Sequence, residues 1–371
     1  MCNELIEKLK WAQTEKLNIL SGFDGFVDEI IHVVDKRIDK DNYIRVKTIE
    51  DYGHKILNAA GVSSNIENVV VQRKMGGNGP IFANGLHCLG VDVTYLGAVG
   101  THSFEDVFSD FSKKVKLIGI AEPAHTDAIE FNDGKLICSK LSSFNGLTWD
   151  KLVEKVGVSG FAKLIDDAHI LSFNNWTMIL SMNDIWTHII QDILPLTQKD
   201  LSKKIIFFDL ADPQKRSKDD LAKAVKLILE FRKIGLNVVL GLNYREALQI
   251  GDIVLGRVLS QNETIEKLTR DLGEMLNLNC LLVHRHKEAA CFTNNTYYEM
   301  SVPYCNTPKL TTGAGDNFNS GFVYAYANQM TPDECLKCAI GTSGYYVRNG
   351  HSPTINELVS FFVEWDSGEL A

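Results

Sequence analysis

The chain has 371 residues and a formal charge of 38 − 47 = −9, a negative balance that speaks against general binding to the phosphates of nucleic acid. Hydrophobic residues make up 45% of the chain and charged residues 23%, which is ordinary for a globular protein with a sizeable core. No run reaches the roughly 18 apolar residues of a membrane span and the start has no secretory core, so we expect a soluble, cytoplasmic protein.

Short apolar runs rich in β-branched and aromatic residues recur along the chain and predict buried strands. In chain order these runs cover residues 17–23, 93–98, 169–173, 205–210, 237–242 and 280–284. Stretches of helical character lie between most of them, at residues 81–89, 182–194, 218–233 and 262–276. Repeated alternation of strand and helix predicts an α/β fold with a doubly wound, mostly parallel sheet flanked by helices.

Two segments break this alternation, residues 31–74 and residues 115–145. Both contain short alternating stretches and turn signals, such as Asn-Asp-Gly at 132–134, that are typical of antiparallel hairpins. We predict that the two segments form a small β lid, discontinuous in sequence, over a large domain made of residues 1–30, 75–114 and 146–371. The alternative is a pair of surface hairpins with no lid role.

A glycine-rich stretch near the C-terminus, LTTGAGDNFNSGFVY at 310–324, carries the most chemistry. Apolar residues recur in it at helical spacing, so a helix is predicted to begin near Gly315 or Asp316. The glycines would let bare N–H groups converge at the helix N-terminus, where the helix dipole also favours negative charge. The stretch therefore predicts an anion cradle suited to phosphate.

Asp316 lies among those amides. Its negative charge would repel phosphate, but its carboxylate could accept a proton from an attacking hydroxyl. The combination predicts phosphoryl transfer to an alcohol. The alternative is a tight Gly-Ala-Gly turn in which Asp316 only caps the helix. The P-loop pattern is absent, and Phe318 stands where GxGxxG needs its last glycine, so neither a P-loop NTPase nor a nicotinamide dehydrogenase is expected.

The stretch TTGAGDNFNSGF resembles the C-terminal signature of the PfkB (ribokinase-like) carbohydrate kinases. The segment GGNGPIFANGLHCLG at 76–90 is similar in spacing to the family's N-terminal glycine segment. NYRE at 243–246 resembles its NxxE motif, and GHSPT at 350–354 resembles its closing turn. The resemblance spans nearly the whole chain and implies the ribokinase-like fold.

Carried over residue by residue, the resemblance implies that Asp316 is the catalytic base. It implies that the amides of Thr312, Gly313, Ala314 and Gly315 form the anion hole for the transferred phosphoryl group.

Asn243 and Glu246 match the family residues that position the ATP phosphates and magnesium-bound water, since Mg²⁺ often meets carboxylates through water. Taken alone, the same NxxE would be a polar turn that caps the next helix.

On the acceptor side, Gly76 and Gly77 would let the backbone approach a sugar, and Asn78 offers both a donor and an acceptor to its hydroxyls. The family places one sugar-binding aspartate after the first strand, where this chain has Asp24 and Asp28. Asp28 is the better match, and Asp24 either shares that work or holds the turn. The alternative for both is a solvated turn residue.

The sequence departs from the family pattern at several positions. Ile81 stands where many members have a polar Asn, and Leu310 replaces an acidic residue, which weakens the case for a monovalent cation site. His284 lies in VHRHKE, where the family has Thr-x-Gly-x-x-Gly along the nucleotide, so it is expected to alter nucleotide contacts or to decorate a loop. Arg216 lies in a stretch that loosely resembles a family turn. It is expected either to form an ion pair or to contact a ligand.

These observations predict an ATP- and Mg²⁺-dependent kinase that phosphorylates a hydroxyl of a sugar or sugar derivative. Closure of the lid would exclude water, and an open lid edge would suit a homodimer. One alternative is a nucleoside kinase, with Tyr43 and Tyr52 available to stack on a base. Another is a non-catalytic sugar- or nucleoside-binding regulator, against which Asp316 argues because a binder needs no base.

Overall fold

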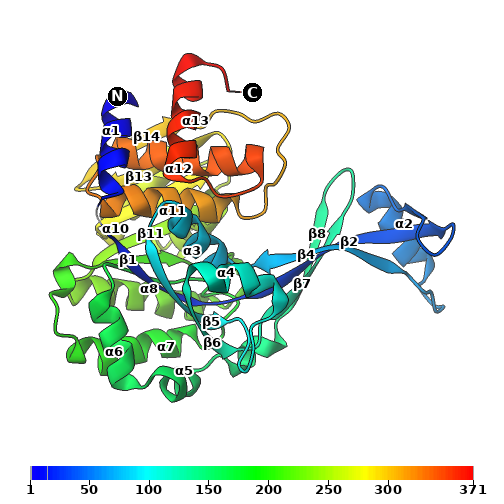
Figure 1. Ribbon diagram of the computed structural model, residues 1–371, viewed down its shortest axis with the longest axis horizontal. Coiled ribbons are helices and arrows are strands. Elements are labelled where there is room, and N and C mark those ends of the chain that lie inside the picture. The colour runs from blue at the N-terminus through cyan, green and yellow to red at the C-terminus, as the bar shows by residue number, and fades with distance from the viewer. Residues whose placement is uncertain (1, 15, 371) are drawn as a thin grey trace.

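The computed structural model describes residues 2–14 and 16–370 of the chain. It has a large α/β body and a smaller β sheet that projects from one side of that body (Figure 1). Both the N-terminal and the C-terminal helix lie on the same side of the body, away from the projecting sheet. The α/β fold with a mostly parallel, helix-flanked sheet is therefore confirmed.

The body is built on a nine-stranded sheet with the order β14-β13-β12-β11-β10-β9-β1-β5-β6. Its strands run parallel except for β13 and β14, which form antiparallel hairpin pairs at one edge. All six predicted strands are present within it. Its bounds are β1 Asn18–Phe23, β5 Asp92–Ala98, β6 Lys116–Ala121, β9 Ile170–Phe173, β10 Ile205–Asp209, β11 Asn237–Asn243, β12 Cys280–Arg285, β13 Glu288–Thr293 and β14 Thr296–Ser301.

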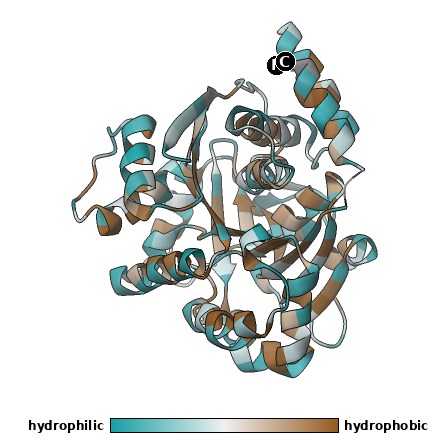
Figure 2. Cartoon of the chain, turned by 90° about the vertical axis from the view of Figure 1, so that its left-hand side faces the viewer, coloured by the Kyte–Doolittle hydropathy of each residue, from teal (hydrophilic) through white to brown (hydrophobic). Residues whose placement is uncertain are grey.

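Two layers of helices cover the faces of this sheet, as the continuous apolar strands require. One layer contains α5 Trp149–Val156, α6 Val158–Asp167, α7 Met182–His188, α8 Lys218–Lys233, α9 Tyr244–Val254 and α10 Ile265–Leu276. The other contains α1 Cys2–Ala12, α3 Asn78–Cys88, α4 Ser109–Lys114, α11 Ala314–Ala327, α12 Pro332–Asn349 and α13 Ile355–Ser367. Hydrophobic residues concentrate on the central strands and on the helix faces turned toward them (Figure 2).

The predicted helices are found, with one change of geometry. Residues 182–194, predicted as one helix, form α7 followed by a π-helical stretch at Ile189–Ile193. Short 3₁₀ segments occur at Asp106–Phe108, Ser142–Gly146, Leu194–Leu196, Leu201–Lys203 and Pro213–Lys215. In the part of the chain that the structure describes, no helix is long and apolar enough to cross a bilayer.

The projecting sheet, which we call the lid, has five strands. Its order is β3-β2-β7-β8, with β4 paired to β2. Its elements are β2 Phe26–Arg37, β3 Tyr43–Arg45, α2 Ile49–Asn58, β4 Asn68–Gly76, β7 Ala124–Glu130 and β8 Lys135–Lys140. The lid has a small apolar core of its own, formed by Ile31, Val33, Val46, Ile129 and Phe131.

The predicted lid boundaries were wrong at the start of both segments. Strand β2 is continuous from Phe26, so the lid sheet starts before the predicted residue 31. Residues 116–121, predicted to lie in the lid, form β6, which pairs in parallel with β5 at the edge of the large sheet. The residues of a single strand do not show which sheet it joins, because that depends on its pairing partner.

Candidate active site

The candidate site lies at the carboxyl ends of the parallel strands, next to β1. From β1 the chain continues to β5 and β6 on one side, and the later strands β9 to β12 lie on the other side. Ligands of open α/β sheets bind outside the carboxyl ends at such a switch point. The N-termini of α3 and α11, two helices that pack against each other, point to the same place.

The glycine-rich stretch forms the start of α11, one residue earlier than predicted. Gly313 is the N-cap at φ 91°, a left-handed conformation that favours glycine, and an added Cβ would lie 2.9 Å from the Tyr346 hydroxyl. That hydroxyl donates to the Thr312 carbonyl at 2.8 Å and fixes the loop. The Ala314 N–H donates to the Thr311 carbonyl at 3.1 Å. The amide of Ala314, one of those predicted to form the anion hole, is therefore already hydrogen-bonded within the loop.

Asp316 lies in the first turn of α11 with only 8% of its surface exposed. Burial raises its pKa to about 8, and the negative charges of Asp24 and Glu246 act in the same direction. The Asn78 side-chain amide donates to Asp316 Oδ1 at 3.0 Å and opposes that shift. A carboxylate with a pKa near physiological pH is well matched to taking a proton from a hydroxyl.

Asn78 was predicted to contact the sugar hydroxyls, and its side-chain N–H₂ is directed instead at Asp316. Asn78 is the first residue of α3, so two helix N-termini bring the amide and the carboxylate together. The contact joins residues 238 positions apart in the chain. The amide oxygen of Asn78 can still accept a hydrogen bond from a sugar hydroxyl.

The glycines before α3 allow a close approach to two carboxylates. A Cβ on Gly76 would lie 2.4 Å from the Asp28 carboxylate, and one on Gly77, at φ 103°, would lie 2.8 Å from Asp24 Oδ2. Distances below 3.0 Å cannot be accommodated without movement of the neighbour. The GGNG segment is therefore shaped around Asp24 and Asp28.

Asp24 is fully buried and its oxygens are already occupied. Oδ1 accepts from the Gly79 N–H at 2.9 Å and from the Tyr95 hydroxyl at 3.2 Å, and Oδ2 accepts from the Asn175 side chain at 2.7 Å. Burial raises its pKa to about 6 despite these hydrogen bonds. Of the two roles considered from the sequence, this geometry favours the structural one, because Asp24 holds the glycine segment from behind.

Asp28 lies on β2, at the junction of body and lid. Burial raises the pKa of its carboxyl group, and the charges of Lys74 and Lys135 together with a hydrogen bond from Thr126 oppose this shift. Lys74 is its direct cross-strand neighbour on β4. Unlike Asp24, Asp28 thus faces lid side chains.

Asn243 and Glu246 form a capping box at the start of α9. The Glu246 N–H donates to Asn243 Oδ1 at 3.0 Å, and the Asn243 N–H donates to Glu246 Oε2 at 2.9 Å. Glu246 Oε1 accepts from the Asp212 N–H at 2.8 Å. The capping alternative is thus observed, and each carboxylate oxygen retains a lone pair for water.

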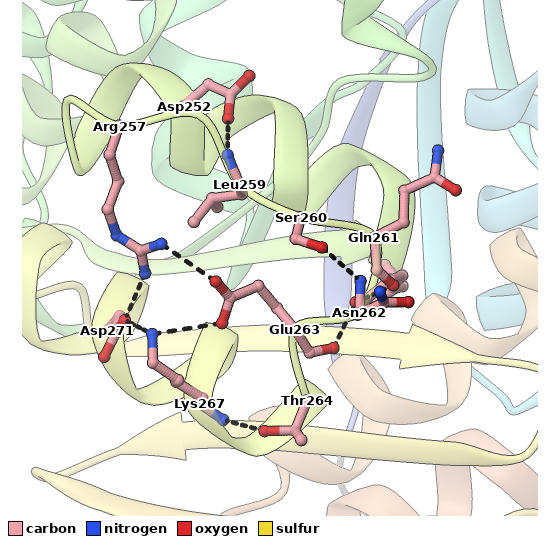
Figure 3. A network of polar contacts seen from close by, with 11 residues as sticks. Asp252, Arg257, Leu259, Ser260, Gln261, Asn262, Glu263, Thr264, Lys267 and Asp271 are labelled. Carbon is pink, nitrogen blue, oxygen red and sulfur yellow. Dashed lines mark hydrogen bonds and ion pairs between the residues drawn. The ribbon is translucent and has the colours of Figure 1, made fainter.

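The loop after α9 is held by a network of ion pairs and hydrogen bonds (Figure 3). Arg257 pairs with Glu263 and with Asp271, both at 3.1 Å. Tyr244, which follows the cap residue Asn243, donates its hydroxyl to the Glu263 carbonyl at 2.5 Å. The network ties this loop to the turn that carries Glu246.

Sequence reasoning missed Asp209, the last residue of β10. Burial raises its pKa well above the usual range, as do the charges of Glu246, Asp316 and Asp24. Its Oδ2 accepts from the Asn319 side chain at 2.9 Å. A carboxylate ending an apolar strand was the available signal, because such strand ends line the ligand crevice.

His284 is the penultimate residue of β12 and lies beside the start of α11. A Cβ on Gly315 would lie 3.7 Å from its ring, and its ring centroid is 4.6 Å from that of Phe318. Burial lowers the pKa of His284 to about 4, with the charge of His286 adding to the shift, so the imidazole is neutral near pH 7. It therefore borders the anion cradle as a neutral group.

Arg216 and Ile81 both contact other parts of the chain. The Arg216 guanidinium donates to the carbonyl of Trp176 at 2.9 Å and stacks on its ring at 4.1 Å, while pairing with Asp220 at 3.4 Å. The Ile81 side chain lies next to Gly313, 3.2 Å from the position that a Cβ on this glycine would occupy.

The tyrosines considered for base stacking are engaged within the lid. The Tyr43 hydroxyl lies 3.0 Å from His32 Nδ1, and Arg37 lies over its ring. Tyr52 packs on Phe131 with a centroid separation of 5.4 Å. These contacts weaken the nucleoside alternative.

Four buried carboxylates act on one another here: the charges of Glu246, Asp316 and Asp24 raise the pKa of Asp209, and those of Asp24 and Glu246 raise the pKa of Asp316. A divalent cation would relieve that repulsion. No three His, Cys, Asp or Glu side chains are placed to hold a metal directly in the described ranges 2–14 and 16–370. Binding through water fits this donor set, as is usual for Mg²⁺.

The fold and this site define a ribokinase-like carbohydrate kinase, and comparison with solved structures shows the same fold. A phosphofructokinase-2 mutant from Escherichia coli matches with a TM-score of 0.64 and 13% identity, covering 95% of this chain and 99% of that one. Ribokinase of Arabidopsis thaliana, complexed with ribose and ATP, matches with a TM-score of 0.62 and 15% identity, covering 94% and 98%.

The family model of prokaryotic ketohexokinases matches residues 6–365, and the chain belongs to that family. The ketohexokinase of Haloferax volcanii is 25% identical over 346 residues, covering 92% of this chain and 90% of that protein. The resemblance to PfkB kinases is confirmed, and the protein is an ATP-dependent carbohydrate kinase.

Proposed function

We propose that this kinase transfers the γ-phosphoryl group of ATP to a hydroxyl of a ketohexose, with Asp316 as the base. The observation that carries the proposal is the position of Asp316, buried in the first turn of α11 beside the Gly313–Gly315 backbone. A proton acceptor there adjoins the place where a helix N-terminus favours phosphate.

The chain's own groups divide the work of the reaction. Asp316 removes the proton of the acceptor hydroxyl, and Asn78 orients its carboxylate through the 3.0 Å hydrogen bond. Backbone N–H groups at Gly313 and Gly315 stabilise charge on the phosphoryl oxygens, which the dipole of α11 reinforces. The amide of Ala314 takes part only if it leaves the Thr311 carbonyl.

Glu246 and Asp209 would hold the Mg²⁺ of Mg·ATP through water, with Asn243 fixing the turn that carries Glu246. Bound there, the ion would offset phosphate charge during transfer. His284 would border the nucleotide as a neutral ring. Leu310 offers no carboxylate to a monovalent cation, so none is assigned.

Asp28 and the Gly76–Gly77 backbone would bind the sugar. The Asp28 carboxylate can accept from two vicinal hydroxyls, and the absence of a side chain on Gly76 keeps its position beside the backbone free. The ketohexose itself is inferred from the family and from the Haloferax volcanii relative.

We also propose that the lid pairs with the lid of a second copy. Val70 and Val71 are successive residues of β4 at a register shift in its pairing with β2, and they are 44% and 45% exposed. Two adjacent exposed valines on a lid strand suggest a covering partner. Sedimentation of wild type and Val71→Lys tests this: a dimer that the substitution dissociates is expected, and a wild-type monomer contradicts it.

The test of the proposed function is ADP release with Mg·ATP across fructose, other hexoses, pentoses and nucleosides, for wild type and Asp316→Asn. We expect turnover that depends on a ketohexose and falls about 10²–10⁴-fold in the variant. Turnover equal in both proteins would remove Asp316 as the base. Preference for a nucleoside would overturn the assigned substrate.

A further inference from the structure

The charged groups around the site come from two sources. On the body side, the charges that act on Asp316 are the carboxylates of Asp24 and Glu246. The cations that act on the sugar-side carboxylate Asp28 are Lys74 and Lys135, and both belong to the lid. Phosphoryl transfer spreads negative charge over the phosphoryl oxygens, so it needs a cation as well as amide donors.

Lys135 reaches from the lid to the loop that begins the anion hole. Its ammonium donates to Thr312 Oγ1 at 3.4 Å, across 177 positions of sequence. Thr312 directly precedes the N-cap Gly313, so the ammonium lies at the entrance to the phosphate cradle. Only 24% of the Lys135 side chain is exposed, although it sits at the end of a surface hairpin.

Glu130 holds that ammonium in place. It is the direct cross-strand partner of Lys135, and its Oε1 lies 3.0 Å from Lys135 Nζ. One carboxylate and one hydroxyl thus fix the ammonium from the lid and from the body. The ion pair leaves the third N–H of the ammonium for another acceptor.

Lys74 has a different task. It lies opposite Asp28 in the β2–β4 pair, and burial lowers its pKa while the charge of Asp28 raises it. The charges of both lysines act on the sugar-side carboxylate Asp28, and Lys135 in addition donates to Thr312 of the phosphate loop.

We propose that Lys135 is a catalytic residue that the lid supplies, contacting the transferred phosphoryl group, and that Glu130 is its positioning residue. This rests on the proposed function. The acceptor oxygen bonds to phosphorus, its proton passes to Asp316, and the bond to the ADP oxygen breaks with its electron pair. Lys135 forms no covalent bond and stabilises charge on the phosphoryl oxygens, where water is excluded once the lid is closed.

The test compares Lys135→Met, Lys135→Arg and Glu130→Gln with wild type. For Lys135→Met we expect kcat to fall about 10²-fold, because one charge-stabilising donor is lost. The KM for the sugar should stay within about threefold, because ground-state binding is intact. Lys135→Arg should recover part of the rate, and Glu130→Gln should lower kcat less than Lys135→Met does.

A transition-state analogue separates catalysis from mere latching of the lid. Affinity for ADP with aluminium fluoride and the sugar should fall in Lys135→Met by about the same factor as kcat/KM. Affinity for the sugar alone should not change. Lys140→Met is the matched control, because Lys140 lies on the same strand, is 59% exposed and pairs with Asp127; it should behave as wild type.

Two outcomes would overturn the role of Lys135 while leaving the kinase assignment intact. One is a Lys135→Met kcat within about threefold of wild type. The other is a loss of sugar affinity as large as the loss of kcat, which would make Lys135 a latch. A wild-type protein with no turnover on any sugar would instead overturn the proposed function, and this role with it. Thermal unfolding of each variant shows whether a loss reflects misfolding.

Discussion

The body and the lid differ in how they hold the charges of the site. On the body, Asp24, Asp209 and Glu246 are buried at strand ends or the first helix turn, and backbone or amide donors fix their oxygens. On the lid, Lys74 and Lys135 are partly exposed: the charge of Lys74 acts on Asp28, and Lys135 contacts Glu130 and the Thr312 hydroxyl.

The two regions also differ in how firmly they are packed. The body has a large apolar core on each face of its sheet, whereas five residues make up the core of the lid. A small core and few partners are features of elements that move. The negative half of the site is therefore held by hydrogen bonds within the body, whereas the positive half comes from the lid, which contacts the body through Lys135 and Thr312.

The largest expected effect is the pH dependence of kcat/KM, which tests the carboxylate Asp316 on the body side of the site. Because burial raises the pKa of Asp316 to about 8, the active carboxylate form is lost below that pH. We expect kcat/KM to fall about tenfold per unit below pH 8, so about a hundredfold at pH 6. A profile at saturating Mg·ATP measures this. A flat profile from pH 6 to 9 would refute the elevated pKa, and His284, with a pKa of about 4, should not contribute.

The next largest effect tests Asp28, which lies at the junction of the body and the lid. In Gly76→Ala, the added Cβ would lie 2.4 Å from the Asp28 carboxylate and displace it. We expect kcat/KM for the sugar to fall at least about tenfold, because Asp28 no longer meets the hydroxyls. The KM for ATP should stay close to wild type.

Gly53→Ala is the matched control for Gly76→Ala. Gly53 lies in α2 of the lid, and an added Cβ there would meet nothing within 4 Å. It should keep wild-type kinetics, since alanine is a better helix former than glycine. Equal sugar kinetics in the two variants would contradict a role for Asp28 in sugar binding.

The smallest effect concerns stability. The carboxyl pKa of Asp316 rises from 3.8 to about 8 on folding, so the native state binds the extra proton between these values. The free energy of unfolding should therefore decrease as pH rises through this window. Asp316→Asn lacks the buried charge, so its thermal midpoint should exceed that of wild type by a few degrees at pH 9.

The same comparison at low pH provides the control. Near pH 5 the native wild-type carboxyl is protonated and most of the window lies above this pH, so the gap between the midpoints should be much smaller than at pH 9. Differential scanning calorimetry of both proteins at pH 5 and pH 9 measures the difference. A gap of equal size at both pH values would show that ionisation of Asp316 is not its source.

Much of the fold could be predicted because its signals are local. The six apolar runs became strands of one sheet, and the helical stretches became helices, since hydrophobic periodicity reflects burial of each element. The start of α11 was placed within two residues by its glycines and apolar spacing. The lid boundary was not, because the pairing partners of Phe26–Arg37 and Lys116–Ala121, which place them in different sheets, are set by tertiary structure.

The sequence alone reveals the chemistry that the chain carries: an aspartate after a glycine turn, carboxylates at strand ends and a polar helix cap. Which of these groups meet depends on the tertiary structure. Asn78 reaches Asp316 and Lys135 reaches Thr312 across long stretches of chain, while Asp24 is sealed behind the glycines. Contacts between distant segments depend on strand order and helix packing, and no local pattern encodes them.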